Sequence, residues 1–206
     1  MELKERYFIN IHKTLTPFVI ILLMVYHENY SLGPVLYLAL HGTYCLNWLL
    51  KELVFPDKGF DRKMHPIMFF LGLIFINGYW ISPYIVVTKE TDPHMLTVLL
   101  AVSSNILGTY LHFCSDVQKY FVLQHRSGLI TDGFFARCRH TNYAGEVMTY
   151  LGFCLLSEHW MPFVNLLFMF CIAFLPAMRR KEKSLSRYEQ YAEYCQKTNM
   201  MFPKLF

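Results

Sequence analysis

The sequence predicts an all-α integral membrane protein, a bundle of about six transmembrane helices with both termini on the inner side of the membrane. Three observations predict this fold class. The 206 residues are 54% hydrophobic and only 17% charged, which is more apolar surface than a soluble domain of this size needs. The apolar residues gather in six runs, and the basic residues fall between alternate runs. We expect one membrane domain over residues 1–206.

The six apolar runs predict six spans in order. Several reach the roughly 20 residues that a helix needs to cross about 30 Å of hydrocarbon. The first and fifth are shorter, so we expect them to be tilted, re-entrant or extended by polar ends. The fifth and sixth form a hairpin around Ser157, Glu158 and His159. The runs are 14–28, 32–50, 65–87, 94–115, 145–157 and 161–178.

The loops are marked by turn residues and by charge. Asp92-Pro93 marks the loop between the third and fourth spans. After the fourth span we expect the helix to continue until Ser127-Gly128 breaks it, and Thr141 or Asn142 to cap the next helix. All 19 lysines and arginines except Lys89 lie on alternate loops, the positive-inside pattern for six spans.

Several classes of protein are not indicated. The net charge of +4 reflects membrane orientation, and no basic tract interleaved with aromatics suggests nucleic-acid binding. Six scattered cysteines without CxxC spacing predict neither a disulfide framework nor a metal site. Walker A, GxGxxG and HExxH patterns are missing from the sequence. A cleavable signal peptide is not expected either.

The stretch "ITDGFFARCRHTNYAGE", residues 130–146, interrupts the apolar sequence with charge. Arginines suit phosphate, whereas carboxylates and Asn suit ribose or amide groups. The alternative is attraction to anionic lipid head groups, which explains Arg179 and Lys181 but not the acids. The arginines predicted to meet on the inner side are Arg126, Arg137, Arg139, Arg179 and Arg180, interleaved with Asp116, Asp132 and Glu146.

Two helix faces carry further candidates. Tyr44, Trp48 and Glu52 are spaced by four and line one face of the second span. A half-buried carboxyl group beside aromatic rings suits general acid chemistry. The alternative, which the residues alone favour, is that Glu52 is an interfacial charge beside Lys51. A polar stripe lies where the fourth span leaves the membrane, formed by His112, Asp116 and Lys119. The end of an amphipathic helix also produces such a stripe.

The stretch "HFCSDVQKYFVLQHRSGLITDGFFARCRHTNYAGEVMTYLGF" resembles the membrane reductases of the steroid 5-alpha-reductase superfamily, especially its small uncharacterised branch. This superfamily also holds sterol reductases and, more distantly, isoprenylcysteine carboxyl methyltransferase. The resemblance covers roughly residues 105–206, through "RRKEKSLSRYEQYAEYC" to "FPKLF", with a weaker echo in "NWLLKELVFP". The element R-x-x-N-Y-x-G-E favours the reductases over the methyltransferases. Its residues are Arg139, Asn142, Tyr143, Gly145 and Glu146.

The resemblance implies an NADPH-dependent reductase of a lipid carbon–carbon double bond of steroid, sterol or enoyl type. Residues 1–104 would then form the substrate side and residues 105–206 the cofactor-binding half. Glu52 with a tyrosine, for which Tyr44 has the right depth, would polarise the substrate carbonyl. The membrane implied is the endoplasmic reticulum, with the mitochondrial inner membrane as alternative. The implied cofactor-binding residues are Asp116, Lys119, Arg126, Arg139, Asn142, Tyr143, Glu146, Arg180 and Tyr188.

Three departures keep two other functions open. The chain is short, "HTNY" replaces the commoner "NPNY", and Lys183 follows Glu182 where the sterol reductases tend to carry paired acids. The first alternative is a non-catalytic accessory subunit of a larger membrane assembly. The second is a methyltransferase that uses S-adenosylmethionine. In each case the partners expected are membrane lipids and, for the enzymes, a lipid substrate.

Overall fold

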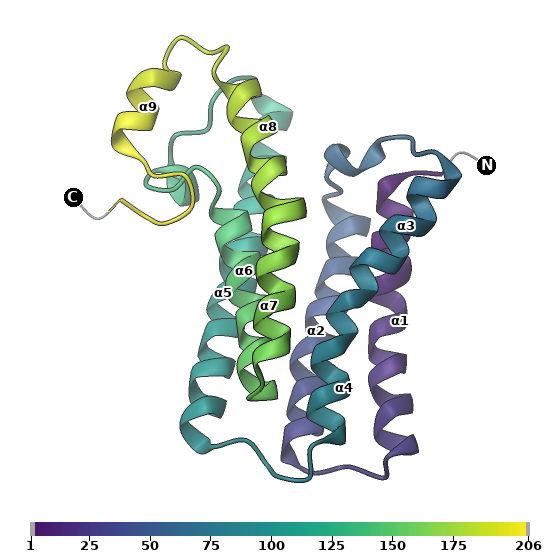
Figure 1. The fold of residues 1–206 in the computed structure, drawn as a ribbon. Helices are drawn as coiled ribbons and strands as arrows, with labels where there is room; N and C mark the ends of the chain where they lie inside the picture. The colour runs from purple at the N-terminus through teal and green to yellow at the C-terminus, as the bar shows by residue number, and fades with distance from the viewer. Residues whose placement is uncertain (1–2, 205–206) are drawn as a thin grey trace. The chain divides into compact units, whose positions relative to one another are not determined.

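Helices account for 77% of the chain in the computed structural model, and residues 3–204, which it describes, contain two isolated β-bridges but no strand (Figure 1). The all-α prediction is therefore confirmed. The last two residues of "FPKLF" lie outside the described residues. The chain divides into two compact units. Unit 1 comprises the residues up to Ser103 with Leu151–Asn165, and unit 2 comprises Ser104–Tyr150 with the residues from Leu166.

Unit 1 is built mainly from the N-terminal helices. The helix α1 (Glu5–Tyr26) packs against α2 (Leu32–Val54), α3 (Pro66–Ile76) and α4 (Ile81–Thr88), as Figure 1 shows. A 3₁₀ turn, η2 (Asn77–Trp80), joins α3 to α4, so the third apolar run forms one interrupted helix. A second 3₁₀ turn, η1 (Lys58–Asp61), packs against α1.

Unit 2 contains most of the long α5 (Met95–His125) and the first part of α6 (Thr141–Ser157). It also holds the end of α7 (Trp160–Met169), the π-helical turn η4 (Phe170–Phe174), α8 (Leu175–Leu185) and α9 (Tyr191–Lys197). Proline at position 176 has no N–H for residue 172 and crowds its carbonyl, which explains the π turn just before it. The stretch Trp160–Leu185 nevertheless runs as one helix through three segments.

The helix α1 carries its polar residues inside and its apolar residues outside. His12 and Lys13 are 0% and 2% exposed, whereas Phe18 and Leu22 are 65% and 68% exposed. A soluble helix does the reverse, and apolar side chains on the outside with polar groups inside are typical of a bundle in lipid. The sequence predicted that Lys13 precedes the first span, because it is charged. In the structure it lies inside α1 and is buried.

Four helices are long and apolar enough to cross a membrane: Glu5–Tyr26, Pro66–Thr88, Met95–His125 and Trp160–Leu185. They correspond to the first, third, fourth and sixth predicted spans. The second and fifth predicted spans are helical, as α2 and α6, but neither is among these four helices. The protein is therefore a helical membrane protein, and the six spans and the sides of the termini stay predictions.

The loops agree with most of the turn signals. The helix α5 continues to His125, and Gly128 and Gly133 both adopt positive φ in the chain that follows. Lys89 forms an ion pair with Glu158 within unit 1, joining two loops that were both predicted on the outer side. Neither predicted residue caps α6 through its side chain, because the Thr141 hydroxyl donates to the carbonyls of Phe134 and Cys138 and the Asn142 amide donates to Asp116.

Candidate functional site

The helices α5 and α6 approach each other closely at two glycines of unit 2. A Cβ atom on Gly145 would lie 2.4 Å from the His112 nitrogen, and one on Gly108 would lie 2.5 Å from the Thr149 nitrogen. Only glycine lets two helix backbones come this near. The glycine of the R-x-x-N-Y-x-G-E element therefore sets the spacing of the two helices.

Hydrogen bonds join these helices along the same crossing. Ser104 donates to the Met148 carbonyl at 2.8 Å and Asn105 donates to the Thr149 carbonyl at 3.2 Å. His112 Nδ1 lies 3.0 Å from the Asn142 carbonyl oxygen. Because apolar packing between helices gains little in lipid, such polar contacts and small residues fix the geometry.

The crossing places the side chain of Asn142 beside Asp116. Asn142 Nδ2 donates to Asp116 Oδ1 at 3.1 Å, and both residues are buried. This bond orients the carboxamide so that one N–H and the oxygen remain for another partner. The sequence predicted both residues for the cofactor. In the structure Asp116 orients Asn142, and Asn142 faces a cavity.

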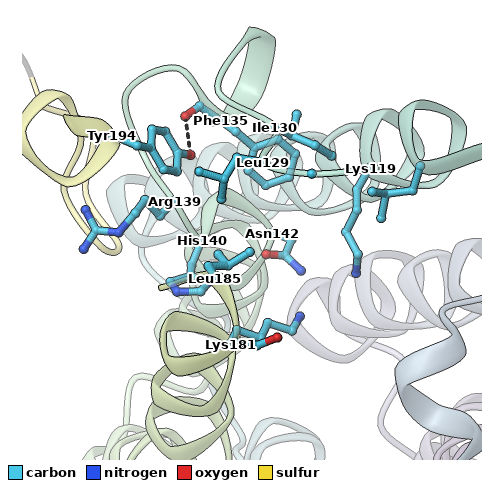
Figure 2. A pocket seen from close by; sticks show the side chains of 13 residues that line it. Lys119, Leu129, Ile130, Phe135, Arg139, His140, Asn142, Lys181, Leu185 and Tyr194 are labelled. Carbon is cyan, nitrogen blue, oxygen red and sulfur yellow. Dashed lines mark hydrogen bonds between the residues drawn. The ribbon is translucent and has the colours of Figure 1, made fainter. Parts of the chain in front are cut away.

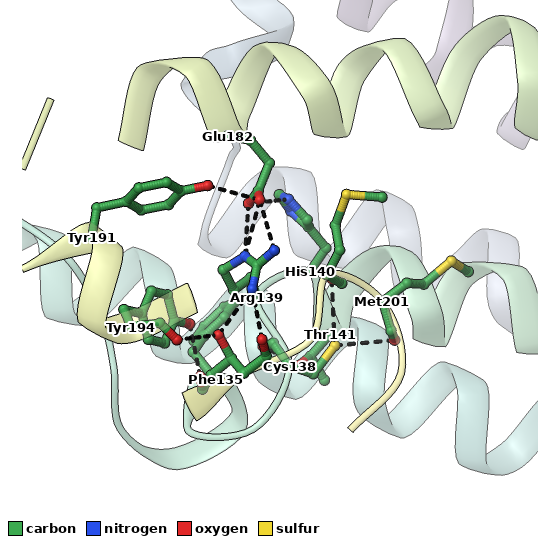
Figure 3. Close-up of polar contacts among 11 residues, drawn as sticks. Phe135, Cys138, Arg139, His140, Thr141, Glu182, Tyr191, Tyr194 and Met201 are labelled. Carbon is green, nitrogen blue, oxygen red and sulfur yellow. Dashed lines mark hydrogen bonds and ion pairs between the residues drawn. The ribbon is translucent and has the colours of Figure 1, made fainter. Parts of the chain in front are cut away.

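An ion-pair network lies at the start of α6, as Figure 3 shows. Arg139 Nη2 lies 2.9 Å from Glu182 Oε2, and Arg139 Nε donates to the same carboxylate at 3.0 and 3.1 Å. His140 Nε2 lies 3.0 Å from Glu182 Oε1, and the Tyr191 hydroxyl donates to Oε2 at 2.8 Å. Glu182 thus joins α8, α9 and the loop before α6.

The same arginine holds the C-terminal segment. Arg139 Nη1 donates to the carbonyl and hydroxyl oxygens of Thr198 at 2.8 and 3.1 Å. Backbone bonds run from Arg139 to Asn199 and from His140 to Met200. The three guanidinium nitrogens of Arg139 are therefore all engaged within the protein.

His140 is neutral at physiological pH in this setting. Its side chain is 3% exposed, and burial is the largest cause that lowers its pKa from 6.5 to about 4, although the Glu182 carboxylate acts in the opposite direction. Lys181 and Arg139 lower the pKa further. A neutral imidazole that donates its Nε2–H to Glu182 leaves no second positive charge beside Arg139.

An open cavity of about 220 Å³ lies next to this network in unit 2 (Figure 2). Its wall is mainly apolar, and its polar residues come from α5, α6, α8 and the loop before α6. Tyr194 closes one side, where its hydroxyl donates to the Phe135 carbonyl at 2.7 Å. The lining residues are Lys119, Leu123, Gly128, Leu129, Ile130, Phe135, Arg139, His140, Asn142, Lys181, Ser184, Leu185 and Tyr194.

Three of the nine predicted cofactor residues line this cavity: Lys119, Arg139 and Asn142. Tyr143 lies beneath Lys181, whose Nζ is 4.6 Å from the ring centroid. Arg126 is exposed and bonded to the Asp132 carboxylate at 3.0 and 3.1 Å.

The other predicted residues lie outside the wall of the cavity. Arg180 is exposed, and the Tyr188 hydroxyl accepts from Arg187 at 3.0 Å. Glu146 is half-buried on α6, one residue after Gly145. None of the three belongs to the lining residues.

The predicted catalytic pair lies in unit 1. The Glu52 side chain is 6% exposed, and among residues 3–204 neither of its carboxyl oxygens has a hydrogen-bond partner. Arg6 Nη1 approaches Oε2 only to 3.8 Å, because Arg6 is held by the Asp57 carbonyl and the Asp61 carboxylate.

Tyr44 is buried under Lys13, whose Nζ lies 4.2 Å from the ring centroid. Eight residues rise about 12 Å along a helix. Tyr44 and Glu52 therefore share a face of α2 but lie at different depths, and their pairing stays a prediction.

Sequence reasoning did not select three residues that organise the cavity. His140 and Glu182 appeared only as departures from the reductase pattern, and Lys181 was assigned to lipid head groups. The sequence signal that could have found them is that each lies in a stretch rich in polar residues. A single sequence cannot show, however, that Glu182 contacts Arg139, which lies 43 residues before it.

The chain is similar to known proteins over parts of its length. A family model described as "Protein of unknown function (DUF1295)" matches residues 58–198. 7-Dehydrocholesterol reductase of Danio rerio is 30% identical over 66 residues, which cover 31% of this chain and 14% of that protein. Cobalt-zinc-cadmium resistance protein CzcN of Cupriavidus metallidurans is 25% identical over 130 residues, which cover 63% of this chain and 54% of that protein. The chain spans about half the length, or less, of these curated relatives.

The helical membrane fold and these matches define a member of the steroid 5-alpha-reductase-like superfamily. Within it, the chain belongs to the family described as proteins of unknown function (DUF1295), whose model covers well over half of its length. The matched region includes every residue of the cavity in unit 2. Tyr44 and Glu52 lie before it.

Proposed function

We propose that the protein is an NADPH-dependent membrane reductase that saturates a carbon–carbon double bond of a lipid. The observation that carries this proposal is the cavity of unit 2, where Asn142, oriented by Asp116, meets two lysines above an apolar wall. Similarity to a sterol reductase supports the reaction class.

The cavity residues fit part of a dinucleotide. Phosphate binds strongly to cations such as Lys119 and Lys181, and a ribose hydroxyl or carboxamide suits the remaining groups of Asn142. The volume of about 220 Å³ is below the roughly 300–1,000 Å³ typical of ligand sites. One nucleotide portion would therefore occupy it and the rest would extend through its open mouth. When bound, NADPH would supply the hydride.

The residues of the chain would bind the cofactor and polarise the substrate, and the proton that completes the reduction would come from water. The network of Arg139, Glu182 and His140 would hold the wall of the cavity rigid, since the Arg139 guanidinium and His140 Nε2 both pair with the Glu182 carboxylate. Glu52 would donate a hydrogen bond to the substrate carbonyl oxygen. A buried carboxyl group without hydrogen bonds is poorly stabilised as an anion, which favours the protonated form that such donation needs.

The endoplasmic reticulum is the membrane that we propose, in line with the sterol reductase relative. A lipid substrate would enter from the bilayer, since the outside of the helices is apolar. A neutral lipid with a double bond conjugated to a carbonyl is the substrate class that a protonated Glu52 suits.

Purified protein in lipid nanodiscs tests the proposal through equilibrium binding of NADPH and S-adenosylmethionine. We expect saturable NADPH binding, and Asn142→Ala should weaken it about tenfold, the effect of losing a hydrogen bond of about 1.4 kcal/mol. The matched control is Asn165→Ala in α7, whose amide donates to the Gly78 carbonyl in unit 1. Binding of S-adenosylmethionine alone would favour the methyltransferase, and binding of neither would favour the accessory subunit.

A further inference from the structure

Three basic residues are exposed on one face of the helix α8. Arg179 and Lys183 are four residues apart, so they lie one above the other, and Arg180 directly follows Arg179. All three residues are exposed. Among residues 3–204, none of these three side chains forms a hydrogen bond or an ion pair with another residue. Their positive charges are therefore available to a partner outside the chain.

The opposite face of α8 packs into unit 2. Met178 is fully buried, the Glu182 carboxylate binds Arg139, and Leu185 lines the cavity. Met178, Glu182 and Leu185 follow the spacing of four and three that defines one helix face. Glu182 is the one acidic residue of α8, and it lies on this inward face. The basic face of α8 is therefore not offset by a carboxylate of the same helix.

The basic face lies at the end of a helix that is long enough to cross a membrane. The stretch Trp160–Leu185, which Figure 1 shows as one continuous helix from α7 to α8, has 26 residues, whereas roughly 20 cross the hydrocarbon layer. The three basic residues lie in its last two turns. Before them the exposed side chains are apolar, with Leu167 at 62% and Ile172 at 56% exposed. This change from apolar to basic places the basic face at the level of the lipid head groups.

We propose that Arg179, Arg180 and Lys183 form a binding surface for the head group of an anionic phospholipid. Guanidinium groups bind phosphate in a bidentate manner, and the lysine adds a third positive charge. An acidic segment of a partner protein would match these charges, but a phospholipid also covers the adjoining apolar surface at Leu167 and Ile172 with its acyl chains. None of the three basic residues lines the cavity of unit 2, so the inference does not rest on the proposed reductase function.

Native mass spectrometry of the full chain in detergent tests the surface. The protein is titrated with short-chain phosphatidic acid and, separately, with short-chain phosphatidylcholine. We expect the wild type to bind phosphatidic acid at least tenfold more tightly. Each single change of Arg179, Arg180 or Lys183 to glutamine should weaken phosphatidic acid binding about fivefold, which corresponds to about 1 kcal/mol for a basic residue near the membrane surface. The triple variant should lose on the order of 100-fold.

Lys197→Gln is the matched control for the loss of one positive charge from unit 2. Lys197 lies on α9 and already pairs with Glu193 at 2.5 Å, so its removal should change phosphatidic acid binding by about twofold or less. The three basic residues of α8 are exposed and unpaired within residues 3–204. Each single glutamine variant should therefore melt within about 2 °C of the wild type, which shows that the fold is kept.

Ionic strength provides a second measurement, which needs no variant. Raising ammonium acetate from about 0.1 M to 1 M shortens the Debye length from about 10 Å to 3 Å, so the wild type should release phosphatidic acid. Equal binding of the two lipids by the wild type would overturn the proposal, as would equal binding of phosphatidic acid by the wild type and the triple variant. NADPH binding should be unchanged in Arg180→Gln. Loss of NADPH with phosphatidic acid still bound would remove Arg180 from the lipid surface.

Discussion

Replacing Gly145 with alanine should separate α5 from α6 and destabilise unit 2. The added Cβ atom would lie 2.4 Å from the His112 nitrogen, 2.6 Å from the Gly108 carbonyl oxygen and 3.0 Å from the His112 Cα atom. All three are backbone atoms, so no side-chain rotation relieves the contact. The helices must move apart, and the bonds that His112 and Asn142 make across the crossing lengthen with them.

The expected loss of stability is at the upper end of overpacking effects. Inserting a methylene into a packed core typically costs about 1–3 kcal/mol, and three close contacts with the backbone of α5 argue for about 3 kcal/mol. At roughly 2–4 °C per kcal/mol for a chain of this size, the melting temperature should fall by about 6–12 °C. Differential scanning fluorimetry in detergent measures the change directly.

The matched control is Gly42→Ala in α2. A Cβ atom there meets only the Leu38 Cδ1 atom at 3.8 Å and the Pro17 Cβ atom at 4.0 Å, which are ordinary contacts. Alanine is also the better helix former by about 0.5–1 kcal/mol. Gly42→Ala should therefore melt at or slightly above the wild-type temperature. A Gly145→Ala protein that melts as high as Gly42→Ala would refute the close crossing.

Three further predictions concern single side chains. Glu52→Gln should reduce NADPH oxidation by a 4-ene-3-keto steroid at least 100-fold while the melting temperature stays within about 2 °C, and undiminished turnover would make Glu52 an interfacial charge. Burial is the main cause that lowers the pKa of His140 from 6.5 to about 4. Below pH 6.5 the unfolded chain therefore protonates His140 while the folded chain keeps it neutral. The free energy of unfolding should keep its full value above pH 6.5 and fall by about 3 kcal/mol toward pH 4. In His140→Gln this part of the pH dependence should vanish, and an unchanged urea-unfolding profile would contradict the assignment. Arg139→Gln leaves Glu182 without its cation and should lower the free energy of unfolding by about 3 kcal/mol. Because Arg139 also holds Thr198, trypsin should then cleave after Lys197 faster than in wild type. An equal rate would show that the C-terminal segment is held by other contacts.

The sequence predicted that Asn142 and Lys119 belong to one polar site, and both line the cavity of unit 2. Their binding of a cofactor stays a prediction. Lys119 lies on α5 and Asn142 on α6. The face of a helix on which a residue lies can be predicted from the sequence alone, because it follows from helical geometry. The all-α fold was predictable for a similar reason, since apolar runs of this length have few alternatives in a membrane.

The partners of Arg139 were not predictable in the same way. An arginine in a basic loop reads as a phosphate ligand until the fold brings Glu182 to it, and that contact spans 43 residues. The positive-inside pattern likewise treated Lys13 as a surface charge, whereas it is buried on the rings of Tyr44 and Trp48. Local patterns report which charges are present, and tertiary contacts decide which of them remain available to a ligand.

The central claim is that unit 2 holds a phosphorylated nucleotide in the cavity beside Asn142 and Lys181. Native mass spectrometry of the protein purified without added nucleotide, followed by release and identification of the bound small molecule, tests it most directly. The account predicts NADPH or NADP⁺ bound to the wild-type protein and depleted in Asn142→Ala. Recovery of phospholipid or S-adenosylmethionine alone, in equal amounts from both proteins, would contradict it.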